Sequence, residues 1–84
     1  MSMRTSEIFE KLNDIFCDVF DDEEINVTAE TSPFDIEDWD SLMQISLIVS
    51  IEKTFGVKFN MDDINRINSA GDIARLIQHK IYEQ

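Results

Sequence analysis

The stretch that decides the fold runs from residue 40 to residue 56 and reads DSLMQISLIVSIEKTFG. Asp40 is a good N-cap, which places Ser41 at the first position of a helix. Gly56 can adopt a positive φ, so we expect the helix to stop after Phe55. The stretch therefore predicts a helix over residues 41–55, with the Ser41 hydroxyl pointing outward at the positive end of the helix dipole.

This predicted helix is apolar on more than one side. Its core face has helical spacing and consists of Leu47, Ile48, Ile51 and Phe55. The first turns carry further apolar side chains on the other sides, namely Leu42, Met43, Ile45 and Val49. Two interpretations remain open at this point. These four residues form a contact surface for a partner or a bound apolar group, or a loop of the same chain covers them.

Helices are also expected on both sides of this one. Residues 5–20 have an apolar stripe with a period of 3.6 residues, and Thr5 or Ser6 is the expected N-cap. Asn60 and Asp63 predict the start of a short helix over about 61–66. Ser69 starts the pattern S-x-x-D and predicts a last helix over about 69–82.

The connection over residues 21–40 is long and acidic, yet rich in large apolar side chains. These are Ile25, Val27, Phe34, Ile36 and Trp39. A disordered linker would not contain so many, so we expect an ordered loop that packs over the core. The predicted fold class is all-α: a small bundle of three main helices and one short helix, with this loop between the first two. We expect one domain over residues 1–84.

Composition excludes several classes of function. The chain has 84 residues, 18 of them acidic and 7 basic, and a formal net charge of −11. Such a chain repels nucleic acid and anionic membranes, and its expected partners carry basic patches. It contains one cysteine, so no internal disulfide and no zinc cluster are expected. We see neither a signal peptide nor an apolar run of about 20 residues, and expect a cytoplasmic monomer.

Ser41 does not have the partners of a catalytic serine. The chain has a single histidine, His79, and no G-x-S-x-G motif, and the acids at 35–40 lack the spacing of a calcium loop. We therefore expect no catalytic residues and no metal site. Since Asp40 already caps the helix, Ser41 remains as an attachment point. The helix dipole and the free N–H groups would favour a phosphate there.

Several features together resemble the acyl carrier proteins of the phosphopantetheine-binding family. They are DSL at 40–42, a long helix that ends in FGV at 55–57, the segment EKTFGVKF at 52–59, and the two helices that follow. The resemblance covers essentially the whole chain. It implies that a phosphopantetheinyl transferase moves 4′-phosphopantetheine from coenzyme A to Ser41, and that the thiol of this arm carries acyl groups as thioesters.

The resemblance also assigns roles to the neighbours of Ser41. Asp40 matches the acid that precedes the serine and serves the transferase and the cap. Leu42 matches a docking residue, and Ile45 and Val49 match positions beside the arm, with Met43 on the same contact surface.

The chain departs from carriers of fatty acid synthesis in two ways. They usually have glycine two residues before the aspartate that matches Asp40, and an acidic row along the exposed helix. This chain has Asp38 there, and its acids lie in the loop, including Asp35 and Glu37. We expect these loop acids to steer basic partners, and the departures favour a dedicated secondary pathway.

Three functions follow for comparison. The first is a free-standing acyl carrier that presents acyl groups to biosynthetic enzymes after loading by a ligase. The second is a carrier of an aminoacyl or alanyl group, loaded by an adenylating ligase. The third is an unmodified helical adaptor that binds a protein through its acidic loop and apolar helix face.

Overall fold

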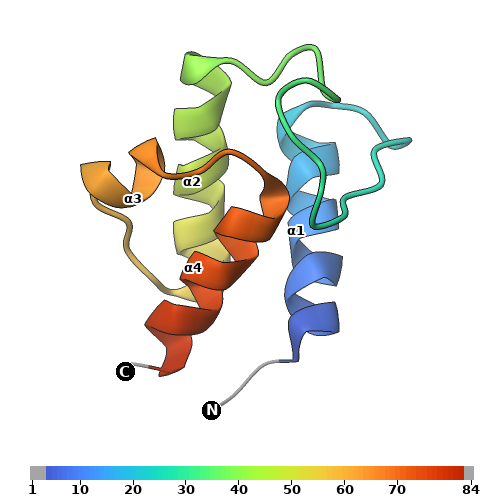
Figure 1. Cartoon of the computed structure of the whole chain (residues 1–84). Helices are drawn as coiled ribbons and strands as arrows, with labels where there is room; N and C mark the ends of the chain where they lie inside the picture. The colour runs from blue at the N-terminus through green and yellow to red at the C-terminus, as the bar shows by residue number, and fades with distance from the viewer. Residues whose placement is uncertain (1–3, 83–84) are drawn as a thin grey trace.

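The computed structural model describes residues 4–82, with side chains over residues 4–81. Within these residues the chain forms four helices and no strand: α1 (Thr5–Val19), α2 (Ser41–Phe55), α3 (Met61–Asn65) and α4 (Ala70–Tyr82). Figure 1 shows α1 and α2 upright beside each other, with α4 across them and the short α3 next to α2. The predicted fold class, a bundle of three main helices and one short helix, is confirmed.

The core lies where the three long helices meet, because α1 packs against both α2 and α4. The largest fully buried side chains come from all three helices: Ile8, Leu12, Phe16, Leu47, Ile51, Ile73 and Ile77. Burial of each such side chain stabilises the fold by about 1.5–3 kcal/mol before entropy is counted. The predicted core face of α2 is confirmed at Leu47, Ile48 and Ile51, while Phe55 is half-buried at its end.

The ends of α2 and α3 follow the expected local chemistry. Gly56 has φ = 68° in the left-handed region, where residues other than glycine are strained, and it ends α2 as predicted. Asn60 and Asp63 form a reciprocal capping box at the start of α3. Helix α3 ends at Asn65, one residue earlier than predicted.

Helix α1 begins at residue 5 as predicted, but the prediction of its N-cap was wrong. The N-cap is Arg4, without a side-chain cap, and Thr5 is the first helical residue. The Thr5 hydroxyl instead accepts a hydrogen bond of 2.9 Å from Gln78 on α4, which ties the two helices together. Helix α1 ends at Val19 instead of residue 20. Helix α4 begins at Ala70, since Ser69 precedes the helix and its hydroxyl accepts from the N–H of Asp72.

The loop between α1 and α2 is fixed to the helices by hydrogen bonds. The Asn13 side chain on α1 accepts from the Val27 N–H at 2.7 Å, and the Ala29 carbonyl accepts from the Gly71 N–H at 3.1 Å. A Cβ atom at Gly71 would lie 2.7 Å from the Ala29 carbonyl oxygen, so only glycine allows this approach. The loop is therefore ordered and packs over one end of the bundle, as expected (Figure 1).

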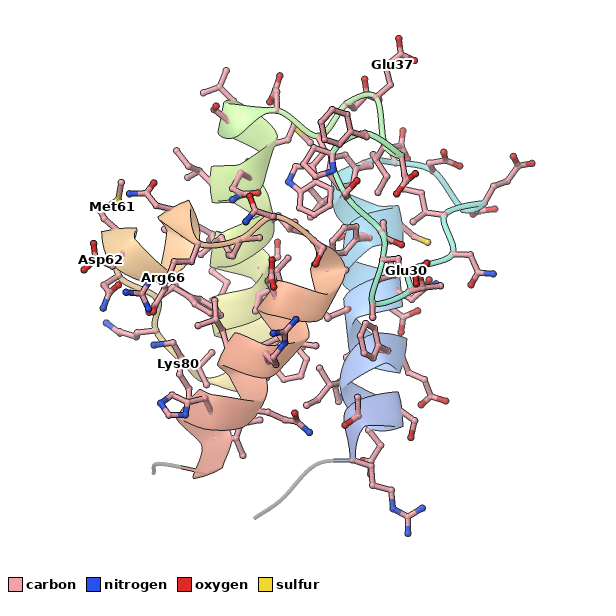
Figure 2. The ribbon with its side chains drawn as sticks, in the orientation of Figure 1. Glu30, Glu37, Met61, Asp62, Arg66 and Lys80 are labelled. Carbon is pink, nitrogen blue, oxygen red and sulfur yellow. The ribbon has the colours of Figure 1, made fainter. Side chains whose placement is uncertain are left out.

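Helix α3 is attached to α4 by an ion pair. The Lys80 ammonium lies 2.9 Å from the Asp63 carboxylate and 5.3 Å from the centre of the Phe59 ring. Figure 2 shows Lys80 extending from the last part of α4. The hydrogen bond from Lys80 lowers the pKa of Asp63 below its usual value, and the Asn60 N–H adds to this. Because both side chains are largely shielded, this pair holds α3 more firmly than a fully exposed pair would.

Candidate functional site

Ser41 lies where the sequence predicts it, at the first position of α2. Asp40 is the N-cap, and its carboxylate accepts a hydrogen bond of 2.9 Å from the Met43 N–H. The Asp40 carbonyl accepts the first helical bond, from Gln44 at 2.9 Å. Ser41 itself is exposed. Its hydroxyl therefore lies in solvent at the positive end of the helix, where free N–H groups favour a negatively charged substituent.

The surroundings of Ser41 do not suit nucleophilic catalysis. His79 is in the last turn of α4, which lies at the end of the bundle opposite the start of α2 (Figure 1). Among the described residues, no group of three or more His, Cys, Asp or Glu side chains is placed to hold a metal ion.

A groove begins at Ser41 and runs between the start of α2 and α3. Its volume is about 500 Å³, within the range of small-molecule sites. Its lining combines apolar and polar side chains from the loop, α2, α3 and the segment after α3: Pro33, Trp39, Asp40, Ser41, Gln44, Ile45, Met61, Ile64, Asn65 and Ile67. The groove thus offers both hydrogen-bonding groups and apolar surface beside the Ser41 hydroxyl.

Three apolar side chains of α2 remain in solvent. Leu42 is 76% exposed, Ile45 is 58% exposed and Val49 is 43% exposed. They lie three and four positions apart and so share one face of the helix. We call these three residues the apolar patch. The long loop does not cover these three residues, so that alternative is excluded for them, while their role as a contact surface stays a prediction.

Met43 differs from the other residues of the predicted contact surface. It is half-buried and packs against the core, because it lies on the side of α2 that faces the rest of the bundle. Its place on the contact surface beside Leu42 therefore stays a prediction, with only part of the side chain accessible.

The predicted acids of the loop lie on its outer side. Asp35, Glu37 and Asp38 are exposed, and Glu37 points away from the helices (Figure 2). The Asp35 carboxylate also accepts a hydrogen bond of 3.0 Å from the Ser32 N–H. This bond closes a tight turn and fixes the path of the chain just before the start of α2.

Sequence reasoning misplaced Phe34, which it expected to pack over the core. Phe34 is 100% exposed at the turn that Ser32 and Asp35 close. Ser32 and Asp35 also exchange a backbone bond of 2.9 Å, so Phe34 is held on a fixed turn. Its neighbour Pro33 lines the groove, whereas Phe34 itself does not. An S-P-x-D turn is the local signal that could have indicated its exposure.

Helix α3 adds a further apolar side chain to this region. Met61 is 68% exposed and lines the groove, and Figure 2 shows it on the outer side of α3. The sequence analysis did not single it out, because methionine at the start of a short helix has no distinctive pattern.

The site residues fit a phosphopantetheine group. A phosphate ester requires an accessible hydroxyl, and Ser41 supplies one at a helix N-terminus. The arm beyond the phosphate contains amides and methylene groups. Gln44, Asn65, Ile45 and Ile64 in the groove offer complementary polar and apolar contacts.

Comparisons with known proteins agree with this fit. A family model described as "Phosphopantetheine attachment site" matches residues 10–77. The acyl carrier protein of Thermotoga maritima is 35% identical over 75 residues, which cover 89% of this chain and 93% of that protein. The acyl carrier protein of Coprothermobacter proteolyticus is 29% identical over 80 residues, or 95% of this chain and 98% of its own length.

A solved structure is similar in both fold and sequence. The solution NMR structure of holo acyl carrier protein from Geobacter metallireducens superposes with a TM-score of 0.85 at 39% identity. The match covers 90% of this chain and 87% of that chain.

Proposed function

The chain belongs to the phosphopantetheine-binding family of acyl carrier proteins, and we propose that Ser41 is its attachment site. Like its relatives it is a carrier protein and not an enzyme, and its prosthetic group is phosphopantetheine. The observation that carries the proposal is the position of Ser41, exposed at the start of α2 with the groove beginning beside it.

The local structure prepares Ser41 for modification by a phosphopantetheinyl transferase. Transfer from coenzyme A forms a phosphate ester at Ser41 Oγ and releases the adenosine bisphosphate half of coenzyme A. Asp40 holds the first turn of α2 in place through the Met43 N–H, so the backbone that carries the Ser41 hydroxyl is fixed. The remaining N–H groups and the helix dipole stabilise the negative charge of the ester. Once attached, the arm supplies a thiol on which an acyl group is carried as a thioester.

Partners are proposed to recognise two adjacent features around Ser41. The apolar patch of Leu42, Ile45 and Val49 offers burial to a complementary surface. The loop acids Asp35, Glu37 and Asp38 attract basic side chains and raise the rate of encounter. Members of the family work with a transferase and with biosynthetic enzymes. We propose that those of this chain, including its loading ligase, carry basic docking patches and work in the cytoplasm.

Within residues 4–82, no helix is long and apolar enough to cross a membrane.

The proposal for the cargo is an acyl group in a dedicated biosynthetic pathway. It rests on the sequence of α2, which carries Met43, Ser46, Ser50 and Lys53 where an acidic row would be expected of a general fatty acid carrier.

The test is intact-protein mass spectrometry after incubation with coenzyme A, magnesium and a broad-specificity phosphopantetheinyl transferase. The wild type and Ser46→Ala should each gain one phosphopantetheine mass, and Ser41→Ala should gain none. Ser46 is the matched control because it is an exposed serine on the same helix. Modification of Ser41→Ala, or no modification of the wild type by several transferases, would contradict the proposal. The second result would leave an unmodified helical adaptor as the better account.

A further inference from the structure

The groove beside Ser41 has a shallow side and a deep side. Met61 and Ile45 on the shallow side are largely exposed. The buried members of the lining are Trp39, which is 5% exposed, and Ile67. A flexible group that entered the bundle from this groove would therefore have to pass these two side chains.

Behind Trp39 lies the aromatic part of the core. The Trp39 ring meets the Phe16 ring edge to face, with centroids 5.3 Å apart, and lies 6.4 Å from the Phe20 ring. Phe16 is completely buried. Trp39 thus forms the wall between the groove and the core.

The side-chain amide of Gln44 on α2 holds Trp39 in place, because its oxygen and its nitrogen each make a hydrogen bond. Its Oε1 atom accepts a hydrogen bond of 2.6 Å from Trp39 Nε1. Its Nε2 atom donates to the Ile64 carbonyl on α3 at 3.3 Å. The same carbonyl accepts from the Ile67 N–H at 3.2 Å, so Gln44 links the two buried residues of the lining. We call these contacts the Gln44 bridge.

Opening the Gln44 bridge is unfavourable for two reasons. An indole N–H and an amide in a half-buried site would lose their partners, and burial without a partner destabilises polar groups. Displacement of Trp39 would also break its ring contacts with Phe16 and Phe20. An apolar chain in the groove gains entry to the core only if its burial exceeds both losses.

We infer that the Gln44 bridge closes the interior of the bundle to the cargo, so that the carried acyl group remains in the surface groove. This inference rests on the proposed attachment at Ser41. Gln44 is then a specificity-determining residue. The protein favours short acyl groups that fit the groove beside polar Gln44 and Asn65, and long apolar chains gain no protection from the core.

The experiment compares acetyl, hexanoyl and decanoyl forms of the protein. Each is made from the corresponding acyl-coenzyme A with a broad-specificity transferase, and intact mass verifies the loading before any further measurement. The variants are Gln44→Ala, which removes the bridge, and Gln78→Ala as the matched control. Gln78 is also a hydrogen-bonded glutamine, but it binds Thr5 on α1 and does not line the groove. Gln44→Met, which keeps the side-chain volume but makes neither hydrogen bond of the bridge, replaces Gln44→Ala with the same expected results if Gln44→Ala folds poorly.

Thermal unfolding and NMR contacts between the decanoyl chain and the Phe16 ring are the readouts. A chain buried in the native state stabilises it, so entry raises the melting temperature. In the wild type and in Gln78→Ala, the three forms should melt within about 2 °C of one another, with no decanoyl contact to Phe16. In Gln44→Ala, the decanoyl form should melt at least about 4 °C above the acetyl form and contact Phe16.

Two results would overturn the inference. One is a decanoyl-dependent rise or a contact with Phe16 in the wild type, and the other is a Gln44→Ala protein that behaves like the wild type. Failure to load would count against attachment at Ser41 instead. The bridge can then still be tested in the unmodified protein by emission and acrylamide quenching of Trp39, the only tryptophan. Gln44→Ala should increase quenching and Gln78→Ala should not; equal quenching would contradict a bridge that holds the indole.

Discussion

Replacement of Asp40 by alanine tests how the start of α2 is built. The Asp40 carboxylate accepts from the Met43 N–H at 2.9 Å, and the substitution leaves this donor without its partner. Loss of an N-cap of this kind costs about 0.5–2 kcal/mol. Asp40 is exposed, so no packing is lost, and removal of one charge from a chain of net charge −11 relieves a little repulsion. We therefore expect a loss of about 1 kcal/mol, which lowers the melting temperature by about 4–8 °C in a domain of this size.

Two further variants separate the cap from the charge and from Ser41. Asp40→Asn keeps an acceptor oxygen and should unfold within about 0.5 kcal/mol of the wild type. The unfolding free energy of Ser41→Ala should also lie within about 0.5 kcal/mol of the wild-type value, because Asp40 provides the cap. The assay is urea unfolding followed by far-UV circular dichroism, with equal m-values as the check on a two-state comparison. The reasoning is refuted if Asp40→Asn is as unstable as Asp40→Ala, or if Ser41→Ala loses as much unfolding free energy as Asp40→Ala.

Three other variants test the core, the ion pair and the exposed loop. Leu47→Ala should lose about 2–5 kcal/mol of unfolding free energy, because Leu47 is fully buried. Leu42→Ala should lose less than about 0.5 kcal/mol, because Leu42 is exposed. Equal losses of the two variants in urea unfolding would mean that the helix register is wrong. The hydrogen bond from Lys80 lowers the pKa of Asp63 in the folded state. The ionised Asp63 carboxylate therefore stabilises the fold fully above its unfolded pKa of about 4, and this stabilisation is lost as the pH falls through the lower pKa of the folded state. Asp63→Asn should therefore be less stable at pH 7 and lose less stability on acidification, and an unchanged pH profile would contradict this role. Phe34→Ser should change the unfolding free energy by less than about 0.5 kcal/mol, since the ring is fully exposed, and a large loss would show that it packs on the core.

The sequence predicted the helices best where their ends depend on local chemistry. Asp40 and Gly56 define α2, and Asn60 and Asp63 define the start of α3, because each acts on backbone groups within a few residues. The N-cap of α1 was predicted wrongly for the opposite reason. Thr5 is bonded to Gln78, 73 positions away in the chain, and no local pattern indicates such a contact.

In the loop between α1 and α2, local sequence patterns also failed to predict which side chains are buried. Trp39 and Phe34 are both large aromatic residues in one connection, and sequence reasoning placed both over the core. Trp39 is buried against Phe16, while Phe34 lies in solvent on a turn closed by hydrogen bonds. Apolarity alone does not separate them, because the path of the loop decides which side chain faces inward.

The region around Ser41 was predicted in part. The exposure of Ser41, Leu42, Ile45 and Val49 agrees with expectation, while Met43 is half-buried. Met43 lies close to the boundary between the two faces of a helix that is apolar nearly all round, where a pattern gives no clear direction. The sequence did not predict the role of Gln44, since a polar residue on a helix usually faces water. Its two hydrogen-bond partners, Trp39 and the Ile64 carbonyl, come from the loop and from α3.

The central claim is that Ser41 carries the phosphopantetheine arm. The most direct measurement is tandem mass spectrometry of the protein isolated from cells that produce it. The account predicts a full-length mass raised by one phosphopantetheine group, and fragments that place the group on Ser41. A protein with its unmodified mass from cells with an active phosphopantetheinyl transferase, or a group located on another residue, would contradict it.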